Sequence, residues 1–562
     1  MKRINVLESG IIPDGGCVSN RLSALIASVG EDTELYFPAG RYYISKPVEI
    51  KGKRRLTLRG DGAVIITHFT PWDDPRENNN GFVCSDCREL IITGFVCTTD
   101  NPIGCAGRVT AKDEAAHTYD VRIDDQFPIT GWEHFWGTDT CDDEGTPDYV
   151  IETYDKITTE TLKDDNGKRR VKFTGTRYTL IGDNLIRVFM PENFDLSRLR
   201  IGHRVLYRYL IYGNTLFQFS DCHDVILSHI EIERCSSMGA VIYPRSSNFT
   251  FEDFNIRVPV GSAALYSANA DGIHIVGLSG YLHMKNCKFR GLGDDALNIH
   301  SQAGEVAEYD RASGRMRCIC RDRQMNEAPL GLKWAQEGDL IRVYERSTFL
   351  EKGTFRIESY SNGKAVIGDI TGGEPAPGDI LANDSFFASV HLDGCEVMHT
   401  RARGFLLQSR NMLIENCKIY GMSLPGIIIS PDVRVWYEVG PSDNVEIRNC
   451  SFEKCAVNGS AANLGAIVVK AAHDSGASDY PAGVHTNLRI KDNRFKNCGS
   501  SGIFVSAAKG VEIGGNDFEG CKVNQNPSVA DTGFDIVCCS CEDIRIGENF
   551  TDKDAALLYK LK

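Results

Sequence analysis

Residues 267–300 read SANADGIHIVGLSGYLHMKNCKFRGLGDDALNIH, and this stretch decides the fold that we expect. Asp271 comes first, and Asp294 and Asp295 follow 23 and 24 residues later. In a solenoid with roughly two dozen residues per turn, this spacing places the three carboxyl groups on neighbouring coils. Stacked coils lie about 4.8 Å apart, so the three side chains would form one crowded acidic cluster.

Two other parts of the chain repeat with nearly the same period. VILSHIEI aligns with FTFEDFNI through Leu227 and Phe251, which are 24 residues apart. Near the C-terminus, KDNRF aligns with GGNDF through Asn493 and Asn516, which are 23 residues apart. The agreement predicts an all-β chain folded as a parallel β-helix. Asparagine recurring at equivalent turns suits a ladder of stacked side chains.

The N-terminal segment predicts a cap on this solenoid. Apolar residues recur at helical spacing over Asn20–Val29, after Ser19 or Asn20 as the N-cap. A helix there would cover the first coil, whose backbone edge is otherwise unpaired. ELYFPAGRYYI (Glu34–Ile44) then predicts two strands around a Pro-Ala-Gly turn, and LTLRGDGAVI (Leu56–Ile65) alternates apolar residues around a Gly-Asp-Gly turn. This succession resembles the opening of many right-handed parallel β-helix carbohydrate enzymes, and the resemblance implies that the β-helix is right-handed.

Two segments lose the coil pattern and predict inserted small β-barrel-like modules. The expected divisions are the cap and first coils (1–103), the first inserted module (104–212), the coils that carry the aspartates (213–301), the second inserted module (302–385) and the C-terminal coils (386–562). Because the second module begins two residues after His300, it would hang beside the acidic cluster and wall the site.

Length and charge narrow the function classes. The chain has 562 residues, more than one ordinary core, but a repeat fold buries each coil against its neighbours. The net charge of −14 argues against nucleic acid and anionic membranes as partners. No apolar run is long enough to span a membrane, and MKRINVLESG lacks the apolar core of a signal peptide. We expect a periplasmic or secreted protein whose signal peptide is absent from this chain, with a cytoplasmic protein as the alternative.

The cysteines recur in one local pattern. Of twenty cysteines, those at 287, 417, 450 and 498 all follow asparagine in NCKF, NCKI, NCSF and KNC. Repetition at equivalent coil positions predicts a buried ladder of small apolar side chains. We therefore expect free thiols rather than a disulfide framework.

A crowded carboxyl trio suits the hydrolysis of glycosidic bonds. Such bonds break when a protonated acid meets the leaving oxygen and a carboxylate acts on the opposite side. Mutual repulsion raises the pKa of one carboxyl and leaves the others ionised, so one cluster supplies both groups. Two other interpretations stay open: the aspartates could bind Ca²⁺, or they could be ordinary turn residues at glycine-rich corners.

The motifs resemble two families of β-helix hydrolases. Asn-x-Asp-Gly followed one coil later by Gly-Asp-Asp is similar to the polygalacturonases, although their later Gly-His-Gly and Arg-Ile-Lys elements are missing from the expected context. A closer resemblance is to glycoside hydrolase family 110, the α-1,3-galactosidases that remove terminal galactose. It rests on ADGIHI, on GDDALNIH leading into an inserted barrel, on RARGFLLQS (Arg401–Ser409) and on WYEVG (Trp436–Gly440).

The resemblance implies an inverting exo-glycosidase that needs no metal or other cofactor. It would hydrolyse terminal α-1,3-linked galactose from glycans such as the blood group B determinant or linear α-1,3-galactosides. Asp294 would be the general acid, and Asp271 and Asp295 would hold the attacking water as general base. Inverting sites keep their carboxyl groups about 6.5–9.5 Å apart, so side chains on adjacent coils would have to splay outward.

Six further residues are candidates for substrate binding, each with a plainer structural alternative. His274 and His300 could bond sugar hydroxyls or be stacked turn residues, and Asn298 shares a strand face with His300. Arg403 could bind vicinal hydroxyls or pair with Glu438. Trp436 could stack on galactose, and Glu438 could bond a hydroxyl. The candidates are His274, Asn298, His300, Arg403, Trp436 and Glu438.

Three other functions remain as alternatives. They are a polygalacturonase-like endo-hydrolase, a calcium-dependent polysaccharide lyase, and a non-catalytic β-helix adhesin. An acidic site suits a polyuronate poorly, and flanking modules favour a pocket over a long groove. The expected partner is therefore an oligosaccharide with terminal galactose, and the coil flanks or the barrels could mediate homo-oligomer assembly.

Overall fold

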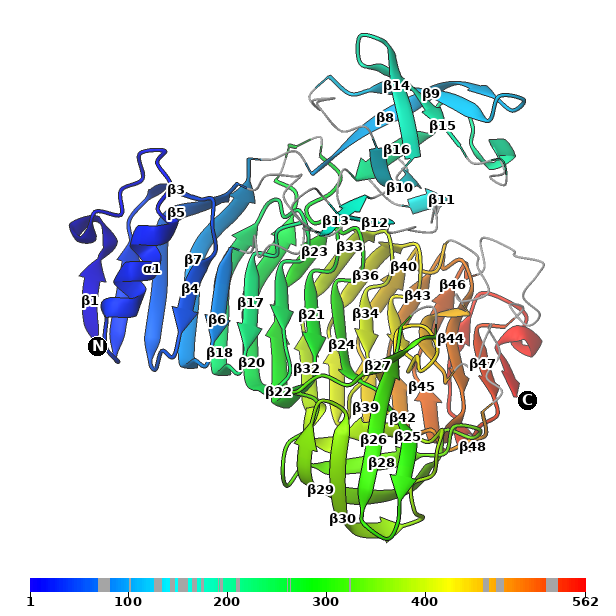
Figure 1. The fold of residues 1–562 in the computed structure, drawn as a ribbon. Helices are drawn as coiled ribbons and strands as arrows, with labels where there is room; N and C mark the ends of the chain where they lie inside the picture. The colour runs from blue at the N-terminus through cyan, green and yellow to red at the C-terminus, as the bar shows by residue number, and fades with distance from the viewer. Residues whose placement is uncertain are drawn as a thin grey trace.

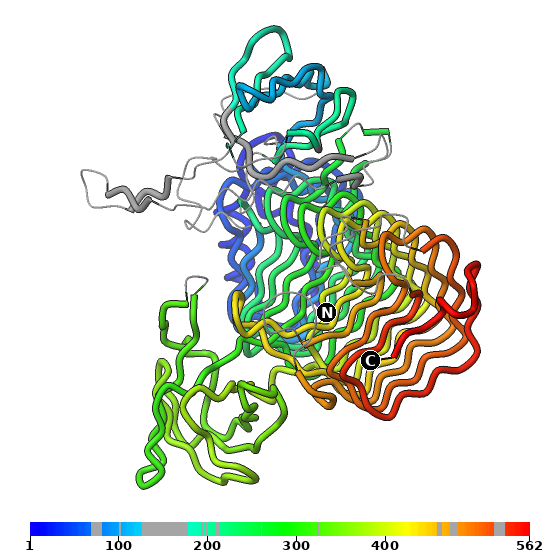
Figure 2. The backbone as a smooth tube through the Cα atoms, turned by 90° about the vertical axis from the view of Figure 1, so that its right-hand side faces the viewer, coloured from blue at the N-terminus to red at the C-terminus, as the bar shows by residue number. Residues whose placement is uncertain are grey.

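The computed structural model shows a right-handed parallel β-helix that carries two small β-barrels (Figure 1). The coils run from the N-terminus at one end to the C-terminus at the other, and Figure 2 shows them stacked one behind another. The structure describes residues 1–68, 81–100, 103–125, 134–141, 147–149, 160–163, 169–172, 176–190, 192, 196–208, 213–259, 261–262, 264–322, 325–457, 464–471, 480–521 and 534–561.

Each coil contributes strands to two parallel sheets. One sheet holds the first and second strands of the coils, which are merged into single long strands in several N-terminal coils. Its members are β1 (Lys2–Asn5), β2 (Thr33–Phe37), β3 (Gly40–Ile44), β5 (Leu56–Thr67), β7 (Arg88–Thr99), β18 (His223–Ile232), β20 (Ser246–Arg257), β22 (Leu278–Lys285), β23 (Lys288–Arg290), β32 (Phe387–Asp393), β33 (Glu396–Thr400), β35 (Met412–Glu415), β36 (Lys418–Met422), β39 (Asp443–Arg448), β40 (Ser451–Glu453), β42 (His485–Lys491), β43 (Arg494–Lys496), β45 (Ala508–Gly514), β46 (Asp517–Glu519), β48 (Glu542–Ile546) and β49 (Phe550–Thr551).

The other sheet holds the third strand of each coil and carries the site described below. Its parallel members are β4 (Val48–Lys51), β6 (Phe82–Ser85), β17 (Phe217–Ser220), β19 (Ala240–Ile242), β21 (Ile273–Val276), β24 (Leu297–Gln302), β34 (Phe405–Leu407), β37 (Ile427–Ile429), β41 (Gly465–Val469), β44 (Ser501–Ser506), β47 (Ile536–Cys539) and β50 (Tyr559–Leu561). A short strand, β38 (Glu438–Val439), pairs with the end of β24 in the antiparallel sense.

The repeat registers predicted from the sequence are confirmed. Leu227 of β18 lies opposite Phe251 of β20. The asparagine turns stack as expected, because the backbone N–H of Asn493 donates to Oδ1 of Asn516 at 3.0 Å, and that of Asn516 donates to Oδ1 of Asn549 at 3.0 Å. Inward-facing side chains form one continuous apolar core along the coil axis, so each coil is buried by its neighbours.

The predicted N-terminal helix is present as α1 (Ser19–Ser28), but its predicted cap is wrong. Val18 occupies the N-cap position and makes no side-chain capping bond. The hydroxyl of Ser19 instead accepts hydrogen bonds from the backbone N–H groups of Ser45 and Lys46, both at 3.2 Å. Tertiary contacts to the next coil therefore replaced the local capping bond. Short 3₁₀ helices occur at η1 (Val6–Ser9), η2 (Leu196–Arg198), η3 (Asp384–Phe386) and η4 (Ala555–Leu557).

Both inserted β modules contain a closed barrel of six antiparallel strands within the described residues. In the first, the strand order β10-β14-β15-β9-β8-β16 closes by the pairing of β16 with β10. Its strands are β8 (Gly104–Asp113), β9 (Thr118–Ile123), β10 (His134–Cys141), β14 (Thr176–Gly182), β15 (Leu185–Phe189) and β16 (Arg204–Arg208), with β11 (Pro147–Tyr149) beside β10 and a separate ribbon of β12 (Glu160–Lys163) and β13 (Arg169–Lys172).

The second barrel closes in the order β25-β31-β28-β29-β30-β26 and returns to β25. Its strands are β25 (Gly304–Asp310), β26 (Arg315–Arg321), β28 (Leu340–Tyr344), β29 (Glu351–Ser361), β30 (Lys364–Gly372) and β31 (Ile380–Asn383), with β27 (Glu327–Pro329) beside β26. The coil stack continues across both insertions, because β18 pairs with β7 and β34 pairs with β24. The two barrels project from different sides of the stack (Figures 1 and 2).

The recurring cysteines lie in the core as free thiols, as the sequence pattern predicts. Those at 287, 417, 450 and 498 are each buried, and each thiol is placed to donate to backbone carbonyl oxygens of its own and the preceding coil. Among the helices that the structure describes, none is long and apolar enough to cross a membrane.

Candidate active site

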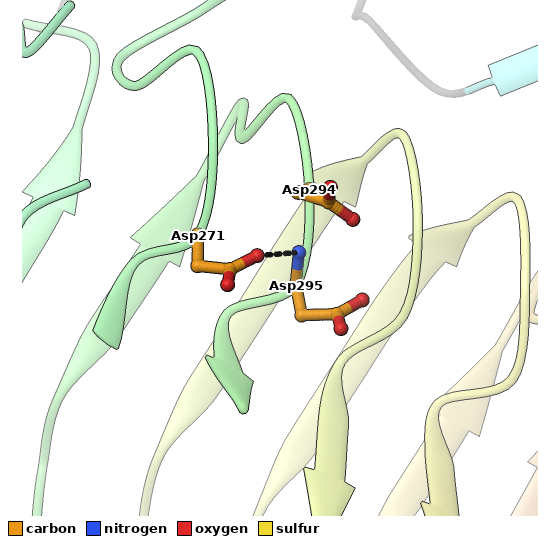
Figure 3. Close-up of side chains that lie close together, drawn as sticks. All are labelled: Asp271, Asp294 and Asp295. Carbon is orange, nitrogen blue, oxygen red and sulfur yellow. Dashed lines mark hydrogen bonds between the residues drawn. The ribbon is translucent and has the colours of Figure 1, made fainter. Parts of the chain in front are cut away.

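The three predicted aspartates lie together on two adjacent turns (Figure 3). Asp271 precedes β21, and Asp294 and Asp295 precede β24, which pairs with β21 in parallel register. One oxygen from each carboxyl group lies within 4.8 Å of the other two. The Asp294 side chain is 27% exposed, whereas that of Asp295 is 1% exposed. The coil period therefore brings the carboxyl groups together and leaves Asp294 as the member that solvent reaches most.

Backbone and arginine donors fix the two buried carboxyl groups. The N–H of Asp295 donates to Oδ1 of Asp271 at 3.1 Å, so the two turns are directly linked. Arg403, from the turn before β34, donates to Oδ1 of Asp295 through its backbone N–H at 3.0 Å and its Nε at 2.7 Å. Three consecutive coils thus contribute to one hydrogen-bonded unit.

The buried members of the cluster hold protons more tightly than free aspartates. Burial raises the pKa of Asp295 to about 7, although the neighbouring Arg403 acts to lower it. Burial also raises the pKa of Asp271, against a hydrogen bond from His274 that favours the ionised form. The negative charge of Asp294 adds to both increases. A cluster of this kind keeps a proton near neutral pH, which acid–base chemistry requires.

A histidine pair continues the network from Asp271. Nδ1 of His274 lies 2.7 Å from Oδ2 of Asp271, and its Nε2 lies 3.3 Å from Nε2 of His300. Burial acts to lower the pKa of His274, but the hydrogen bond to Asp271 and the negative charges of Asp271, Glu438 and Asp295 together outweigh it, and the pKa is raised. Burial lowers the pKa of His300. These directions assign the extra proton of the pair to His274, with His300 as the neutral acceptor.

Glu438 closes the far side of this network. Its Oε1 lies 3.6 Å from Nε2 of His300, and its Oε2 accepts a 2.9 Å hydrogen bond from Nε2 of Gln408. The sequence left open a pair between Arg403 and Glu438, but the closest carboxylate partner of Arg403 is Asp295. The difference arises because Arg403 lies in the turn directly after the coil of Asp295, within reach of its carboxyl group.

The segment 432–439, which we call the strap, follows β37 of the coils and carries Glu438 to the site, where it contacts the second barrel. Its turn is closed by Oδ1 of Asp432, which accepts from the backbone N–H groups of Arg434 and Val435. The hydroxyl of Tyr437 donates to Oε2 of Glu305 in β25 at 2.6 Å, and the N–H of Ala303 donates to the Tyr437 carbonyl at 2.7 Å. The second barrel therefore positions one wall of the site.

Trp436 and Asn298 differ in accessibility. Trp436 is 51% exposed and lies at the surface of the strap. Asn298 is 6% exposed and lies opposite His274 in the register of β21 and β24. The roles of both residues as sugar contacts stay predictions.

The sequence interpretation missed two arginines that donate hydrogen bonds to the turns carrying the aspartates. Nη1 of Arg208, in β16 of the first barrel, donates to the carbonyls of Asn269 and Gly293 at 2.8 and 3.0 Å. Nε of Arg401 also donates to the Gly293 carbonyl, at 2.6 Å, and its Nη2 lies 3.7 Å from Oδ2 of Asp294. Arg401 belongs to the RARG motif, which could have indicated it. Arg208 follows no periodic signal.

The carboxyl oxygens of the cluster are also potential ligands for a cation such as Ca²⁺. An oxygen that already accepts a hydrogen bond is less free to bind a metal, so the hydrogen bonds of the cluster indicate how well a cation fits. Both oxygens of Asp271 and one oxygen of Asp295 already face N–H donors or an imidazole nitrogen. The guanidinium of Arg403 lies against the same carboxyl group and repels a second cation. This donor set suits acid–base chemistry better than a calcium site, whose ligands are oxygens alone.

The fold and the site define a parallel β-helix protein with a cluster of three carboxyl groups in the turns that precede two strands of its third-strand sheet. A family model described as "Right handed beta helix region" matches residues 380–550. Among solved structures, a family 28 exopolygalacturonase from Yersinia enterocolitica overlaps with a TM-score of 0.44 at 11% identity, covering 97% of this chain and 78% of that one.

Curated relatives match nearly the whole chain and point to a narrower class of protein. Alpha-1,3-galactosidase B of Bacteroides thetaiotaomicron is 25% identical and covers 92% of this chain and 86% of its own. Alpha-1,3-galactosidase A of Peterkaempfera griseoplana is 25% identical, covering 94% and 77%, and that of Shewanella woodyi is 24% identical, covering 92% and 85%. The resemblance to the α-1,3-galactosidases that the motifs indicated is thus confirmed at the level of homology.

Proposed function

We propose that the protein is an exo-acting, inverting α-1,3-galactosidase that releases terminal galactose from glycans such as the blood group B determinant or linear α-1,3-galactosides. The observation that carries the proposal is the carboxyl cluster, with one oxygen of each aspartate within 4.8 Å of the others. The names of the relatives supply the sugar and the linkage. The two flanking barrels favour a bounded site over an open groove.

In the proposed mechanism, Asp294 is the general acid. It is the most exposed carboxyl of the three, so it can meet the glycosidic oxygen of a bound substrate. Asp294 takes up the proton that the cluster keeps and donates it to that oxygen as the bond to the anomeric carbon breaks. Water adds to the anomeric carbon from the opposite side and loses a proton to Asp271 or Asp295. The raised pKa values of these two carboxyl groups make them stronger bases than ordinary aspartates.

The experiment compares wild type with Asp271→Asn, Asp294→Asn and Asp295→Asn on an aryl α-galactoside and on α-1,3-linked galactobiose. Each substitution removes a proton donor or acceptor without changing the side-chain shape, so we expect each to lower kcat by about 10²–10⁴-fold. Asp253→Asn is the matched control, because Asp253 lies in β20 outside the aspartate cluster and asparagine tolerates its left-handed φ of 49°. Release of no galactose by wild type would reject the proposal.

NMR of the freshly released sugar tests the stereochemistry. Inversion yields β-galactose first, whereas retention yields α-galactose. Retaining sites have carboxyl groups about 5–5.5 Å apart and inverting sites about 6.5–9.5 Å apart. The nearest oxygens of this cluster are closer than either range, so the resemblance to family 110 carries the inverting part of the proposal. Initial α-galactose would contradict that part alone. A periplasmic or secreted location and self-assembly also stay predictions.

A further inference from the structure

Lys470 is a buried cation that the proposed mechanism does not use. It directly follows β41, whose last residue, Val469, faces the core. His300 and Gln408 likewise follow core residues at equivalent positions of β24 and β34. Because side chains alternate along a strand, the three residues share one row on the outer face of the third-strand sheet. That row includes His300, which contacts His274 beside the aspartates, and runs toward the C-terminal coils.

The amine of Lys470 has no partner within the described part of the chain. The residue is only 7% exposed, yet its Nζ makes no hydrogen bond or ion pair there. Other partly buried lysines of this fold are paired: Nζ of Lys352 lies 2.8 Å from Asp379, and Lys553 contacts Asp535. An unpaired buried charge is costly to the folded state, so a ligand that supplies acceptors would relieve that cost.

The surroundings of Lys470 connect it to the active site. Burial, together with the positive charge of Arg403, lowers the pKa of Lys470 to about 8, while Asp432 of the strap acts in the opposite direction. Arg403 itself binds Asp295. Lys470 therefore lies near the arginine that holds the cluster and near the strap that forms the opposite wall.

The chemistry of this wall favours a neutral ligand that carries hydroxyl groups. An ammonium group donates three hydrogen bonds and needs oxygen acceptors. A ligand with its own negative charge would meet the repulsion of Asp432, whose charge acts on Lys470. Sugar hydroxyl oxygens accept hydrogen bonds without adding charge, so they fit both conditions.

We propose that Lys470 is a substrate-contacting residue whose ammonium group donates hydrogen bonds to hydroxyl oxygens of a neutral sugar bound beside the aspartate cluster. The inference rests on the function proposed above and adds a residue that neither the motifs nor the aspartate network includes.

The test uses the full-length chain with Lys470→Met and Lys470→Arg. Methionine keeps the apolar stem and removes the donors, whereas arginine keeps a charged donor. Galactose and α-1,3-galactobiose are titrated calorimetrically, and kcat and KM are measured in parallel. A hydrogen bond to a charged group contributes about 1.5–3 kcal/mol, so Lys470→Met should weaken binding by about 10–100-fold. Lys470→Arg should retain more affinity than Lys470→Met.

Two controls separate contact from folding. Lys285→Met removes an exposed lysine from β22 and should change binding less than twofold. Urea unfolding should place Lys470→Met at or above the wild-type stability, because the substitution removes an unpaired buried charge. A Lys470→Met variant that binds normally, or one that loses binding only together with a large loss of stability, would overturn the inference.

The pH dependence of binding gives a second measurement. The charged amine is the donor, so wild-type affinity should be highest below about pH 8 and fall as the amine loses its proton. The charges of Arg403 and Asp432 act on the amine of Lys470. The buried imidazole of His485 contacts the backbone carbonyl of Lys470. Burial lowers the pKa of His485 to about 4, so its imidazole stays neutral across this range. Lys470→Arg should not show the fall above pH 8. An identical fall in that variant would assign the titration elsewhere and contradict the inference.

Different results would reject the galactosidase activity and the Lys470 contact. Sugar binding that depends on Lys470 without hydrolysis would reject the galactosidase activity and keep the contact. Hydrolysis unaffected by Lys470→Met would reject the contact and keep the activity. A wild-type protein that binds neither galactose nor galactobiose would reject both.

Discussion

At the scale of single residues, Arg403 sets the proton affinity of the candidate base. Its guanidinium lowers the pKa of Asp295, which burial otherwise raises, and the net value is about 7. Removing the guanidinium must therefore raise that pKa further. A general base works only when it is deprotonated, so activity is lost as the pH falls through the pKa of the base.

We predict that Arg403→Met shifts the acidic limb of the kcat/KM profile to higher pH, by about one unit or more. The profile is measured between pH 5 and 9 on an aryl α-galactoside. Arg489→Met is the control. It removes an arginine of β42 that pairs with Glu446 of β39, and it should leave the acidic limb in place. A limb that stays fixed or moves to lower pH in Arg403→Met would show that Asp295 is not the base.

The sequence could predict the aspartates because their spacing equals the coil length. Ile273 pairs with Leu297 at an offset of 24, so any side chain at that offset meets its neighbour on the next coil. Arg208 could not be predicted in this way. Its contacts reach 61 and 85 residues along the chain from a barrel whose docking no periodicity encodes. Local spacing therefore reveals contacts between coils, whereas contacts between modules need the folded structure.

At the scale of elements, the strap depends on one buried carboxylate of the second barrel. Oε2 of Glu305 accepts from the hydroxyl of Tyr437, and both Glu305 oxygens also bind arginines of the barrel. The strap in turn presents Glu438 to His300. Loosening the hydroxyl bond should move the strap without removing any group that touches substrate.

We predict that Tyr437→Phe raises KM by about three- to tenfold, with a smaller change in kcat, and lowers the free energy of unfolding by about 1–2 kcal/mol. Steady-state kinetics and urea unfolding measure the two effects. Tyr360→Phe is the matched control, because its hydroxyl donates to the Leu330 carbonyl at 3.0 Å away from the strap. It should lose similar stability and keep its KM. Equal changes of KM in both variants would assign the effect to the barrel as a whole.

The sequence predicted both barrels but not how they meet the site. Loss of the coil pattern and short alternating runs indicated inserted β modules. The antiparallel pairing of β38 with the end of β24 had no such signal, since the WYEVG motif contributes only two residues to a strand. The bonds of Tyr437 and Ala303, and the paired backbone bonds between Asp432 and Glu438, fasten the strap next to this short pairing.

At the scale of the whole molecule, stability is distributed along the coil axis. Each coil packs mainly against its two neighbours, so a defect should be felt most within a few coils. The period of 23–24 residues was enough to predict this architecture, because it repeats in the core side chains as well as in the turns. The apolar core of the coils and those of the two barrels form separate clusters.

The aromatic stack of the C-terminal coils tests this distribution. The ring of Phe495 is fully buried, 5.0 Å from that of Phe452 and 4.8 Å from that of Phe518. We predict that Phe495→Ala lowers the free energy of unfolding by about 3–5 kcal/mol. Hydrogen exchange should lose protection mainly in residues 485–519, whereas residues 267–300 should keep theirs. In the sheet, the strands β33, β36 and β40 lie between β23 and β43, so the two regions are not in contact through adjacent strands.

Because the aspartates lie several coils from this stack, kcat/KM at 25 °C should stay within about twofold of wild type while the chain becomes less stable. Phe550→Ala, at a ring that is 54% exposed, is the control and should change neither protection nor activity. Uniform loss of protection across both regions, with activity falling in parallel, would mean that the coils unfold as one cooperative unit. The site's rigidity would then come from the entire solenoid rather than from the neighbouring coils and the arginines that tie its turns.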